Sequence, residues 1–324
     1  MTSLAVVVIG RNEGERLRRC LMSVCAPGTP VVYVDSGSTD GSIALARAMQ
    51  ADAVELDMRV PFTAARARNA GWRRVRELAA ATRFVQFIDG DCEMWPGWLA
   101  AARGHLDANP QVAVVAGRLR ERHPERSIYN RLADIEWDTP VGAAKAVGGI
   151  AMMRLEALAA VGGFREDLIA GEEPELCVRL RGAGWTVWRL PDDMAWHDAA
   201  MTRFSQWWRR TVRAGFAFAE GAHLHGRPPE RHWVRESRSA LLWGLAIPAV
   251  IALLAVALGP AALWLVLVYP LQVLRLFLRE PGPPATRAAR AFFLVLGKFA
   301  EALGELRYAL GRWRGGPARL IEYK

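Results

Sequence analysis

Residues 84–91 read Phe-Val-Gln-Phe-Ile-Asp-Gly-Asp, an apolar run that ends in two aspartates one residue apart. Such a run is typical of a strand buried on both faces of a parallel sheet. The carboxylates of Asp89 and Asp91 would then stand where the strand opens into a loop. Carboxylate oxygens are the ligands that hard divalent cations prefer. The stretch therefore predicts a strand that brings a candidate Mg²⁺ or Mn²⁺ site to one edge of a sheet, although the same tripeptide also occurs in ordinary turns.

Strands and helices alternate on both sides of this stretch. Short β-branched runs at residues 4–9, 31–35, 112–117 and 186–190 are separated by helical stretches rich in Ala, Arg and Leu. This alternation predicts stacked βα units around a largely parallel sheet, in an α/β domain spanning residues 1–225. Ligands bind beyond the carboxyl ends of the strands in such sheets. We therefore expect Arg11 and Asp35 to line one rim together with the two aspartates.

Composition narrows the classes of partner. The 42 basic and 33 acidic residues leave a formal charge of +9, which suits phosphate-bearing ligands, anionic lipid or nucleic acid. No nucleic-acid partner is expected, because the basic residues do not interleave with aromatic ones in a patch of the α/β domain. The four cysteines have no Cys-x-x-Cys spacing, so the sequence suggests neither a zinc site nor a disulfide framework.

Residues 241–278 are apolar almost throughout, with Arg275 as the only charged residue. Gly259 and Pro260 divide the run into two pieces, 240–258 and 261–278, each close to the roughly 20 residues that a bilayer span needs. We expect a transmembrane hairpin within a segment at 226–280. Arginines on both flanks predict that both ends lie in the cytoplasm, which places the α/β domain on the cytoplasmic side of the cell inner membrane. The alternative is a buried helical hairpin in a soluble protein.

The segment at 281–324 contains large apolar residues that recur every three or four positions from Phe292 to Trp313. This spacing predicts an amphipathic helix. Its basic end carries Arg307, Arg312, Arg314 and Arg319, which favours a position among anionic membrane lipids in the headgroup region. Packing of this helix against the α/β domain is the alternative.

Several motifs occur in a fixed order along the chain. Residues 6–13 read Val-Val-Val-Ile-Gly-Arg-Asn-Glu, residues 34–41 Val-Asp-Ser-Gly-Ser-Thr-Asp-Gly, and residues 67–71 Ala-Arg-Asn-Ala-Gly; Asp-x-Asp, Gly148-Gly149 and Gly-Glu-Glu-Pro-Glu-Leu at 171–176 follow. This ordered set, across residues 3–215, resembles the family 2 glycosyltransferases, an inverting group with the GT-A fold. The resemblance implies an enzyme that transfers a sugar from a UDP- or GDP-linked donor to an acceptor hydroxyl.

The resemblance also implies a role for each matching residue. The nucleotide-sugar donor would contact Ile9, Arg11, Glu13, Asp35, Ser36, Arg68, Asp89 and Gly90. The metal ion would be held by Asp91, Asp89 and His197, and the acceptor would approach Gly148, Gly149, Trp207 and Arg210. Glu173, with Glu172 as the other candidate, would take the proton from the acceptor hydroxyl. Burial beside Glu172 would raise its pKa toward the operating pH, as a general base requires.

Two positions depart from the family pattern. Ser36 stands where relatives often have Asp, so a preference for uracil is less firmly implied, and Glu173 is longer than the usual Asp. Each role also has a plainer alternative. The acidic residues at 172–175 would stabilise a helix N-terminus in any protein, and a lone histidine such as His197 is often simply packed. Residues 206–210, Gln-Trp-Trp-Arg-Arg, resemble the Gln-x-x-Arg-Trp element of processive polysaccharide synthases, but they also suit an amphipathic interface helix.

Two other functions compete with sugar transfer. A sugar nucleotidyltransferase would open with a glycine-rich, lysine-ended phosphate loop, and none precedes Asn12. A membrane-tethered scaffold that only binds nucleotide sugars would have no physical need for Asp89, Asp91 and Glu173 at one rim. The membrane segment favours an acceptor that is itself lipid-linked, either a glycan on a lipid carrier or a glycolipid, with one sugar transferred per encounter.

Overall fold

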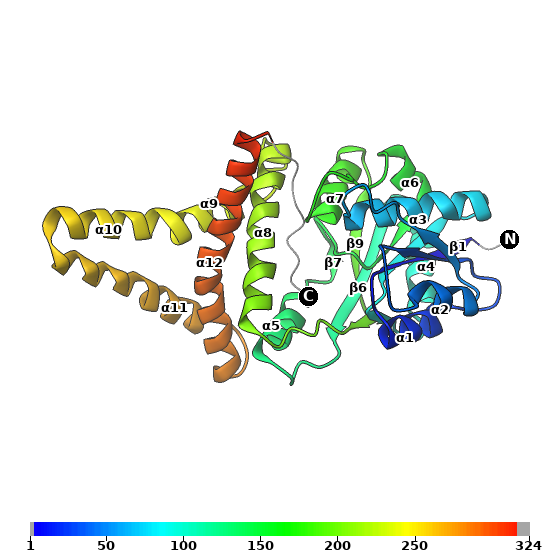
Figure 1. Ribbon diagram of the computed structural model, residues 1–324, viewed down its shortest axis with the longest axis horizontal. Helices are drawn as coiled ribbons and strands as arrows, with labels where there is room; N and C mark the ends of the chain where they lie inside the picture. The colour runs from blue at the N-terminus through cyan, green and yellow to red at the C-terminus, as the bar shows by residue number, and fades with distance from the viewer. Residues whose placement is uncertain (1–2, 316–324) are drawn as a thin grey trace. The chain divides into compact units, whose positions relative to one another are not determined.

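A computed structural model describes residues 3–315 and divides the chain into two compact units, Met1–Ala200 and Met201–Lys324. Figure 1 traces the chain through both. The division falls earlier than the boundary expected near residue 225. Helix α8 (Phe204–His225) is grouped with the second unit because it packs along α12 (Pro284–Trp313).

The first unit is built on a mixed sheet, which has nine strands within the described residues, in the order β3-β2-β1-β4-β8-β6-β9-β5 with β7 beside β9. Strands β1 (Leu4–Gly10), β2 (Val31–Asp35), β3 (Asp52–Glu55) and β4 (Phe84–Asp89) pair in parallel. Strand β8 (Ala151–Arg154) runs antiparallel between β4 and β6 (Val112–Glu121). Strand β9 (Thr186–His197) is parallel to β6 and antiparallel to β5 (Cys92–Met94) and β7 (Gly142–Ala143).

The five strands expected from the sequence are all present, and β2 and β4 have the expected bounds. Strands β6 and β9 run further than expected, to Glu121 and His197. The sequence did not predict β3, β5, β7 or β8, which have at most four residues each. Antiparallel pairing therefore enters the sheet through short strands without a long apolar run. The extension of β9 matters most for function because it brings His197 beside β5.

The helices of this unit are α1 (Glu15–Val24), α2 (Ser42–Ala48), α3 (Ala64–Leu78), α4 (Trp98–Ala108), α5 (Ile128–Glu136), α6 (Leu155–Ala160) and α7 (Glu172–Gly182). Helix α3 begins after Thr63, whose hydroxyl accepts a hydrogen bond from the Arg66 amide at 3.2 Å. It lies directly on the sheet because Gly71 has no side chain: a Cβ there would overlap Val7 and come within 3.2 Å of Val34. This close contact places the α3 side chains next to the strand ends.

The carboxyl ends of β1, β2 and β4 meet at one rim. Gly10 is in register with Asp35, and Ile9 is in register with Asp89. Hydrogen bonds join the loops that follow β1 and β2: the Asn12 amide donates to Ser38 Oγ at 2.9 Å, and the Gly14 amide donates to Asp40 at 3.0 Å. The rim expected from the sequence is thus a connected structure.

The second unit contains two helices that are long and apolar enough to cross a membrane, Val234–Leu258 and Pro260–Arg279. The first comprises α9 (Val234–Leu241), a π-helical turn η1 (Leu242–Ala246) and α10 (Ile247–Leu258); the second comprises a 3₁₀ segment η2 (Pro260–Leu267) and α11 (Val268–Arg279). They form a hairpin that extends away from α8 and α12 (Figure 1). Only 6% of the apolar window of the first helix is buried, and none of the second. A soluble protein would bury such surface, so this exposure favours the membrane hairpin.

Helix α12 is the amphipathic helix expected after the hairpin. It packs against α8 at glycines: a Cβ on Gly304 would overlap Val212 O and lie 2.5 Å from the Phe216 amide nitrogen. A second row of apolar side chains is exposed, including Leu306 at 44% and Trp313 at 83%. The helix therefore has one packed face and one apolar face open to its surroundings. Arg319, in the expected basic tail, lies outside the described residues.

Candidate active site

Arg68 on α3 joins three carboxylates. Its Nη2 lies 3.2 Å from Oδ1 of Asp89, and its Nη1 lies 2.8 Å from Oε1 of both Glu172 and Glu173. The Arg68 side chain is 4% exposed. Burial alone would lower its pKa, but the charges of Glu173, Asp89 and Glu172 outweigh burial and raise it. The guanidinium thus stays charged, and it links the end of β4 to the start of α7. We call these four residues the Arg68 cluster.

Glu173 is the more exposed of the two candidate bases. Helix α7 begins after Gly171, which adopts a left-handed conformation at φ 79°, and its first turn carries both glutamates. The Glu173 side chain is 12% exposed and that of Glu172 is 5% exposed. Burial, followed by the neighbouring charge of Glu172, raises the pKa of Glu173 to about 7, against the opposing effect of Arg68. A carboxyl group with this pKa can both accept and release a proton near neutral pH.

The two predicted acceptor glycines differ in their surroundings. A Cβ on Gly149 would overlap Nη2 of Arg68 and lie 2.8 Å from Oε1 of Glu173, whereas a Cβ on Gly148 would meet no described atom within 4 Å. The backbone at Gly149 therefore rests directly on the Arg68 cluster. Any side chain at this position would have to displace the guanidinium or the carboxylate.

The predicted donor residues of β1 and β4 gather at the rim. The Gly90 amide donates to Ile9 O at 2.8 Å, and a Cβ on Gly90 would lie 3.3 Å from Cγ of Glu13. Arg11 is exposed in the loop after β1. Ile9, Glu13 and Gly90 therefore lie together where β1 and β4 end, next to Asp89.

Asp35 and Ser36 at the end of β2 are both 1% exposed. The Asp35 carboxylate accepts hydrogen bonds from Tyr33 Oη at 2.9 Å and from the amides of Gly37 and Ser38 at 2.9 and 2.8 Å. These bonds shape the loop, and they occupy both carboxylate oxygens. The Ser36 hydroxyl has no hydrogen-bond partner within residues 3–315. At this strand end, the Ser36 hydroxyl is therefore available to form a hydrogen bond with a ligand.

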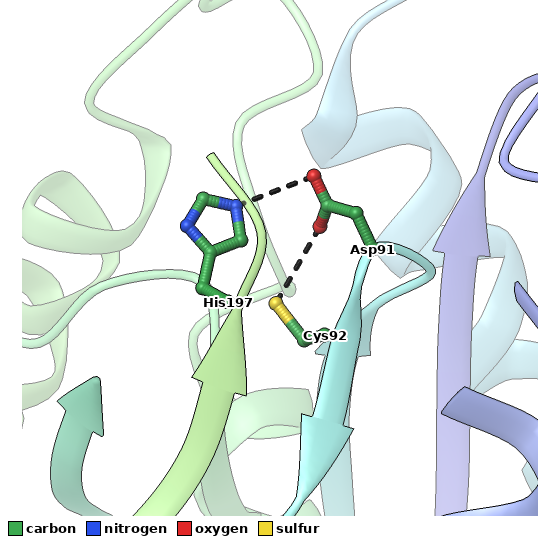
Figure 2. A group of neighbouring side chains, drawn as sticks. All are labelled: Asp91, Cys92 and His197. Atoms are coloured by element: carbon green, nitrogen blue, oxygen red, sulfur yellow. Dashed lines mark hydrogen bonds and ion pairs between the residues drawn. The ribbon is translucent and has the colours of Figure 1, made fainter. Parts of the chain in front are cut away.

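A second cluster lies beyond Asp89 and contains Asp91, Cys92 and His197 (Figure 2). Nε2 of His197 lies 3.3 Å from Oδ2 of Asp91, and the Cys92 thiol donates to Oδ1 of Asp91 at 3.4 Å. One potential ligand atom from each residue lies within 4.8 Å of the other two. Burial, then the charge of Asp89, raises the pKa of the Cys92 thiol well above its usual range. We call these three residues the metal-ligand group.

This group differs in one member from the expected ligand set. Asp89, expected as a ligand with Asp91 and His197, contacts Arg68 in this structure, and the third potential donor beside Asp91 and His197 is Cys92. No role was predicted for Cys92, because the cysteines lack a Cys-x-x-Cys spacing. Its only signal is that it directly follows Asp-x-Asp, and that signal becomes informative once β5 pairs with β9. A carboxylate and an imidazole are nevertheless suitable ligands for a divalent ion such as Mn²⁺.

The chain is similar to several known proteins in sequence and in fold. Residues 5–158 match the family model described as glycosyl transferase family 2. The N-terminal unit, over these residues, therefore belongs to glycosyl transferase family 2. A mannosyltransferase from Pyrobaculum calidifontis, solved in complex with GDP-Man and Mn²⁺, has a similar structure over 94% of this chain and 87% of its own, with a TM-score of 0.62 and 24% identity. This likeness confirms the GT-A fold of the family 2 chain.

Two curated relatives of this family 2 chain are each 28% identical to it. The pre-mycofactocin glycosyltransferase of Mycobacterium tuberculosis aligns over 242 residues, which are 70% of this chain and 48% of the relative. The succinoglycan biosynthesis protein ExoA of Rhizobium meliloti aligns over 203 residues, which are 58% of this chain and 60% of the relative. The chain thus spans about half the length of the curated relatives it matches.

Trp207 and Arg210, the remaining predicted acceptor residues of the family 2 chain, lie on α8 in the second unit. The Trp207 side chain is buried, and its ring centroid lies 4.8 Å from that of Phe293 on α12. Its neighbour Trp208 instead lines a shallow cavity with Phe204, Ser205 and Arg209. On this helix, therefore, Trp208 rather than Trp207 presents an accessible indole ring.

Proposed function

We propose that this chain is an inverting glycosyltransferase that moves a sugar from a nucleotide-diphosphate donor to an acceptor hydroxyl. The observation that carries the proposal is the Arg68 cluster, in which one guanidinium contacts both Asp89 at the donor rim and Glu173. A donor held at the end of β4 would therefore have the candidate base beside it. Family membership supports sugar transfer, and it favours neither the scaffold nor the nucleotidyltransferase alternative.

In this mechanism Glu173 accepts the proton of the acceptor hydroxyl. The acceptor oxygen forms a bond to the anomeric carbon as the bond from that carbon to the diphosphate oxygen breaks on the opposite face. The configuration at the anomeric carbon is therefore inverted. Arg68 holds the ionised form of Glu173 in place at 2.8 Å. Burial, and then the charge of Glu172, keeps the pKa of Glu173 high enough for it to accept a proton. Gly149 leaves the space that both side chains need.

Asp91 and His197 would hold Mn²⁺ or Mg²⁺, and the ion, when bound, neutralises charge on the diphosphate leaving group. The presence of GDP-Man and Mn²⁺ with the Pyrobaculum mannosyltransferase supports a nucleotide sugar and a divalent ion here. The donor nucleotide, UDP or GDP, would lie along Ile9, Arg11 and Ser36. Asp89 would contact the donor while it remains paired with Arg68.

The hairpin would anchor the enzyme in the cell inner membrane, with the first unit on the cytoplasmic side. The exposure of both apolar helices and the arginines at both ends of the hairpin support this placement. An anchored enzyme meets acceptors at the membrane surface, so we propose a lipid-linked glycan or a glycolipid as acceptor. Full activity on soluble sugars after deletion of the segment beyond Arg238 would contradict a lipid-linked acceptor.

The full chain, purified in detergent, should be incubated with UDP-, GDP- and dTDP-sugars, and nucleotide release should be measured with Mn²⁺, with Mg²⁺ and with chelator. We expect release from one nucleotide class, dependent on the metal and lost in Asp91→Asn and Glu173→Gln. Asp107→Asn is the matched control, since this carboxylate lies on α4 and pairs with Arg83. Equal rates of nucleotide release in all three variants and the wild type would contradict the proposal that this chain is a glycosyltransferase with this site.

A further inference from the structure

We propose that Asp91, Cys92 and His197 together bind thiophilic divalent ions, Zn²⁺ above all, and that Zn²⁺ at this site competes with the ion that supports sugar transfer. This inference deepens the proposed function. Its kinetic part, the competition of Zn²⁺ with the ion that supports sugar transfer, rests on the proposed function, whereas Zn²⁺ binding itself does not. It starts from the presence of one oxygen, one sulfur and one nitrogen donor in a single group.

The three donors lie close enough together to share one ion. Zn²⁺ binds its ligands at about 2.0–2.3 Å, so that ligand atoms at tetrahedral positions stand roughly 3.3–3.7 Å apart. Oδ2 of Asp91 lies 3.3 Å from Nε2 of His197, Oδ1 of Asp91 lies 3.4 Å from Sγ of Cys92, and one ligand atom from each residue lies within 4.8 Å of the other two. Figure 2 shows the imidazole and the thiol directed at the two oxygens of the one carboxylate, so small side-chain adjustments would bring one oxygen, the sulfur and the nitrogen to tetrahedral spacing.

The sheet holds this arrangement in place. Cys92 at the start of β5 is in register with His197 at the end of β9, and opposite residues of an antiparallel pair project to the same face. His197 is also in register with Glu121 on β6. The buried Glu121 carboxylate accepts from the Ala199 amide at 3.0 Å, which fixes the chain directly after His197. Side chains held this firmly lose little freedom when an ion binds.

Donor chemistry separates the ions. Mg²⁺ and Mn²⁺ favour oxygen ligands and would leave Cys92 as a thiol, using Asp91 and His197. Zn²⁺ would displace the thiol proton to solvent and bind the sulfur as thiolate, and the Irving–Williams order already places Zn²⁺ above Mn²⁺. Three protein ligands leave a tetrahedral ion a single open position. One position cannot accept two phosphate oxygens, so bound Zn²⁺ should inhibit a reaction that Mn²⁺ supports.

Cobalt binding tests the site without any need for activity, because thiolate-bound Co²⁺ absorbs in the near ultraviolet. The full chain should be titrated with Co²⁺ and Zn²⁺ as wild type, Cys92→Ser and Cys177→Ser. Cys177 is the matched control, since it is also buried but lies on α7 outside the metal-ligand group. We expect the absorption band in the wild type and in Cys177→Ser, and Zn²⁺ affinity about 10–100-fold weaker in Cys92→Ser.

Mn²⁺ affinity is measured by competition with Co²⁺ in the Cys177→Ser protein and directly by Mn²⁺ paramagnetic resonance in Cys92→Ser. We expect the same Mn²⁺ affinity in both proteins. Retained Mn²⁺ binding in Cys92→Ser would also show that its site is folded. A wild type without the band, a band that persists in Cys92→Ser, or equal Zn²⁺ affinities would overturn the proposal. In the kinetic arm, Zn²⁺ should inhibit Mn²⁺-supported nucleotide release at lower concentrations in the wild type than in Cys92→Ser. Were no donor turned over at all, the proposed function would fail while the cobalt spectrum still decided the metal site.

Discussion

Nη1 of Arg68 lies 2.8 Å from Oε1 of Glu173, in a pair that joins helix α3 to the first turn of α7. The same nitrogen lies 2.8 Å from Glu172, so one cation serves two adjacent carboxylates as well as Asp89. Burial, followed by the neighbouring charge of Glu172, raises the pKa of Glu173 and explains why this group remains readily protonated despite its ion pair. Proton transfer and charge balance at the candidate site therefore depend on a single guanidinium.

Glu173→Gln should lower the rate of sugar transfer by roughly 10²–10⁴-fold, the usual contribution of a general base. In the wild type, transfer should rise with pH through about 7, because only the ionised carboxylate accepts a proton. The residual rate of Glu173→Gln should not show this rise. Glu77→Gln, at a position 65% exposed on α3, serves as the control and should keep the wild-type profile. A Glu173→Gln enzyme with the wild-type profile would assign the base elsewhere.

Glu173 should also make stability depend on pH. Burial and Glu172 raise its pKa in the folded state from 4.5 to about 7. The folded protein therefore holds this proton more tightly than the unfolded chain does. The stability that the proton supplies is complete below pH 4.5 and is lost as the pH rises through about 7. The stability of Glu173→Gln minus that of the wild type, measured by thermal unfolding, should accordingly be larger at pH 8 than at pH 5. A pH-independent difference between them would contradict the raised pKa.

Gly149 and Gly148 form a matched pair for mutation. A Cβ at Gly149 would overlap the Arg68 guanidinium, whereas one at Gly148 would meet no described atom within 4 Å. We expect Gly149→Ala to displace Arg68 or Glu173 and to lower transfer by at least 10²-fold, since misplacement by about 1 Å can cost that much. Gly148→Ala should stay close to the wild-type rate. Similar rates in the two variants would show that the backbone at Gly149 does not rest on the cluster during turnover.

The crossing of α8 and α12 depends on Gly304. Its substitution by alanine would drive a methyl group against the backbone of Val212 and Phe216, at a cost of about 1–3 kcal/mol in the free energy of unfolding. Gly311→Ala on the same helix is the control, because a Cβ there meets no described atom within 4 Å. It should be neutral or stabilise the helix by up to about 1 kcal/mol. Denaturant unfolding in detergent would compare the two, and equal effects would contradict close packing at Gly304.

Some features could be predicted because they are local. The apolar run at 84–89 and the residues of β2 determine buried strands from their own composition, and residues 240–278 are too apolar to be an ordinary surface segment. Other features depend on partners far along the chain. Strand β8 has only four residues, and it is a strand because β4 and β6 flank it. Trp207, predicted to contact an acceptor, is buried against Phe293, a contact that sequence spacing cannot reveal.

The sequence by itself determined the α/β domain, the apolar hairpin and the carboxylates that a glycosyltransferase of this family uses, because periodicity and motif order lie within short windows of the chain. The tertiary structure decided which of those carboxylates meet. It paired Asp89 with Arg68, and it brought Cys92 to His197. The physical reason is strand register, since pairing between β5 and β9 is set by the packing of the whole sheet and not by the residues on either side of Cys92.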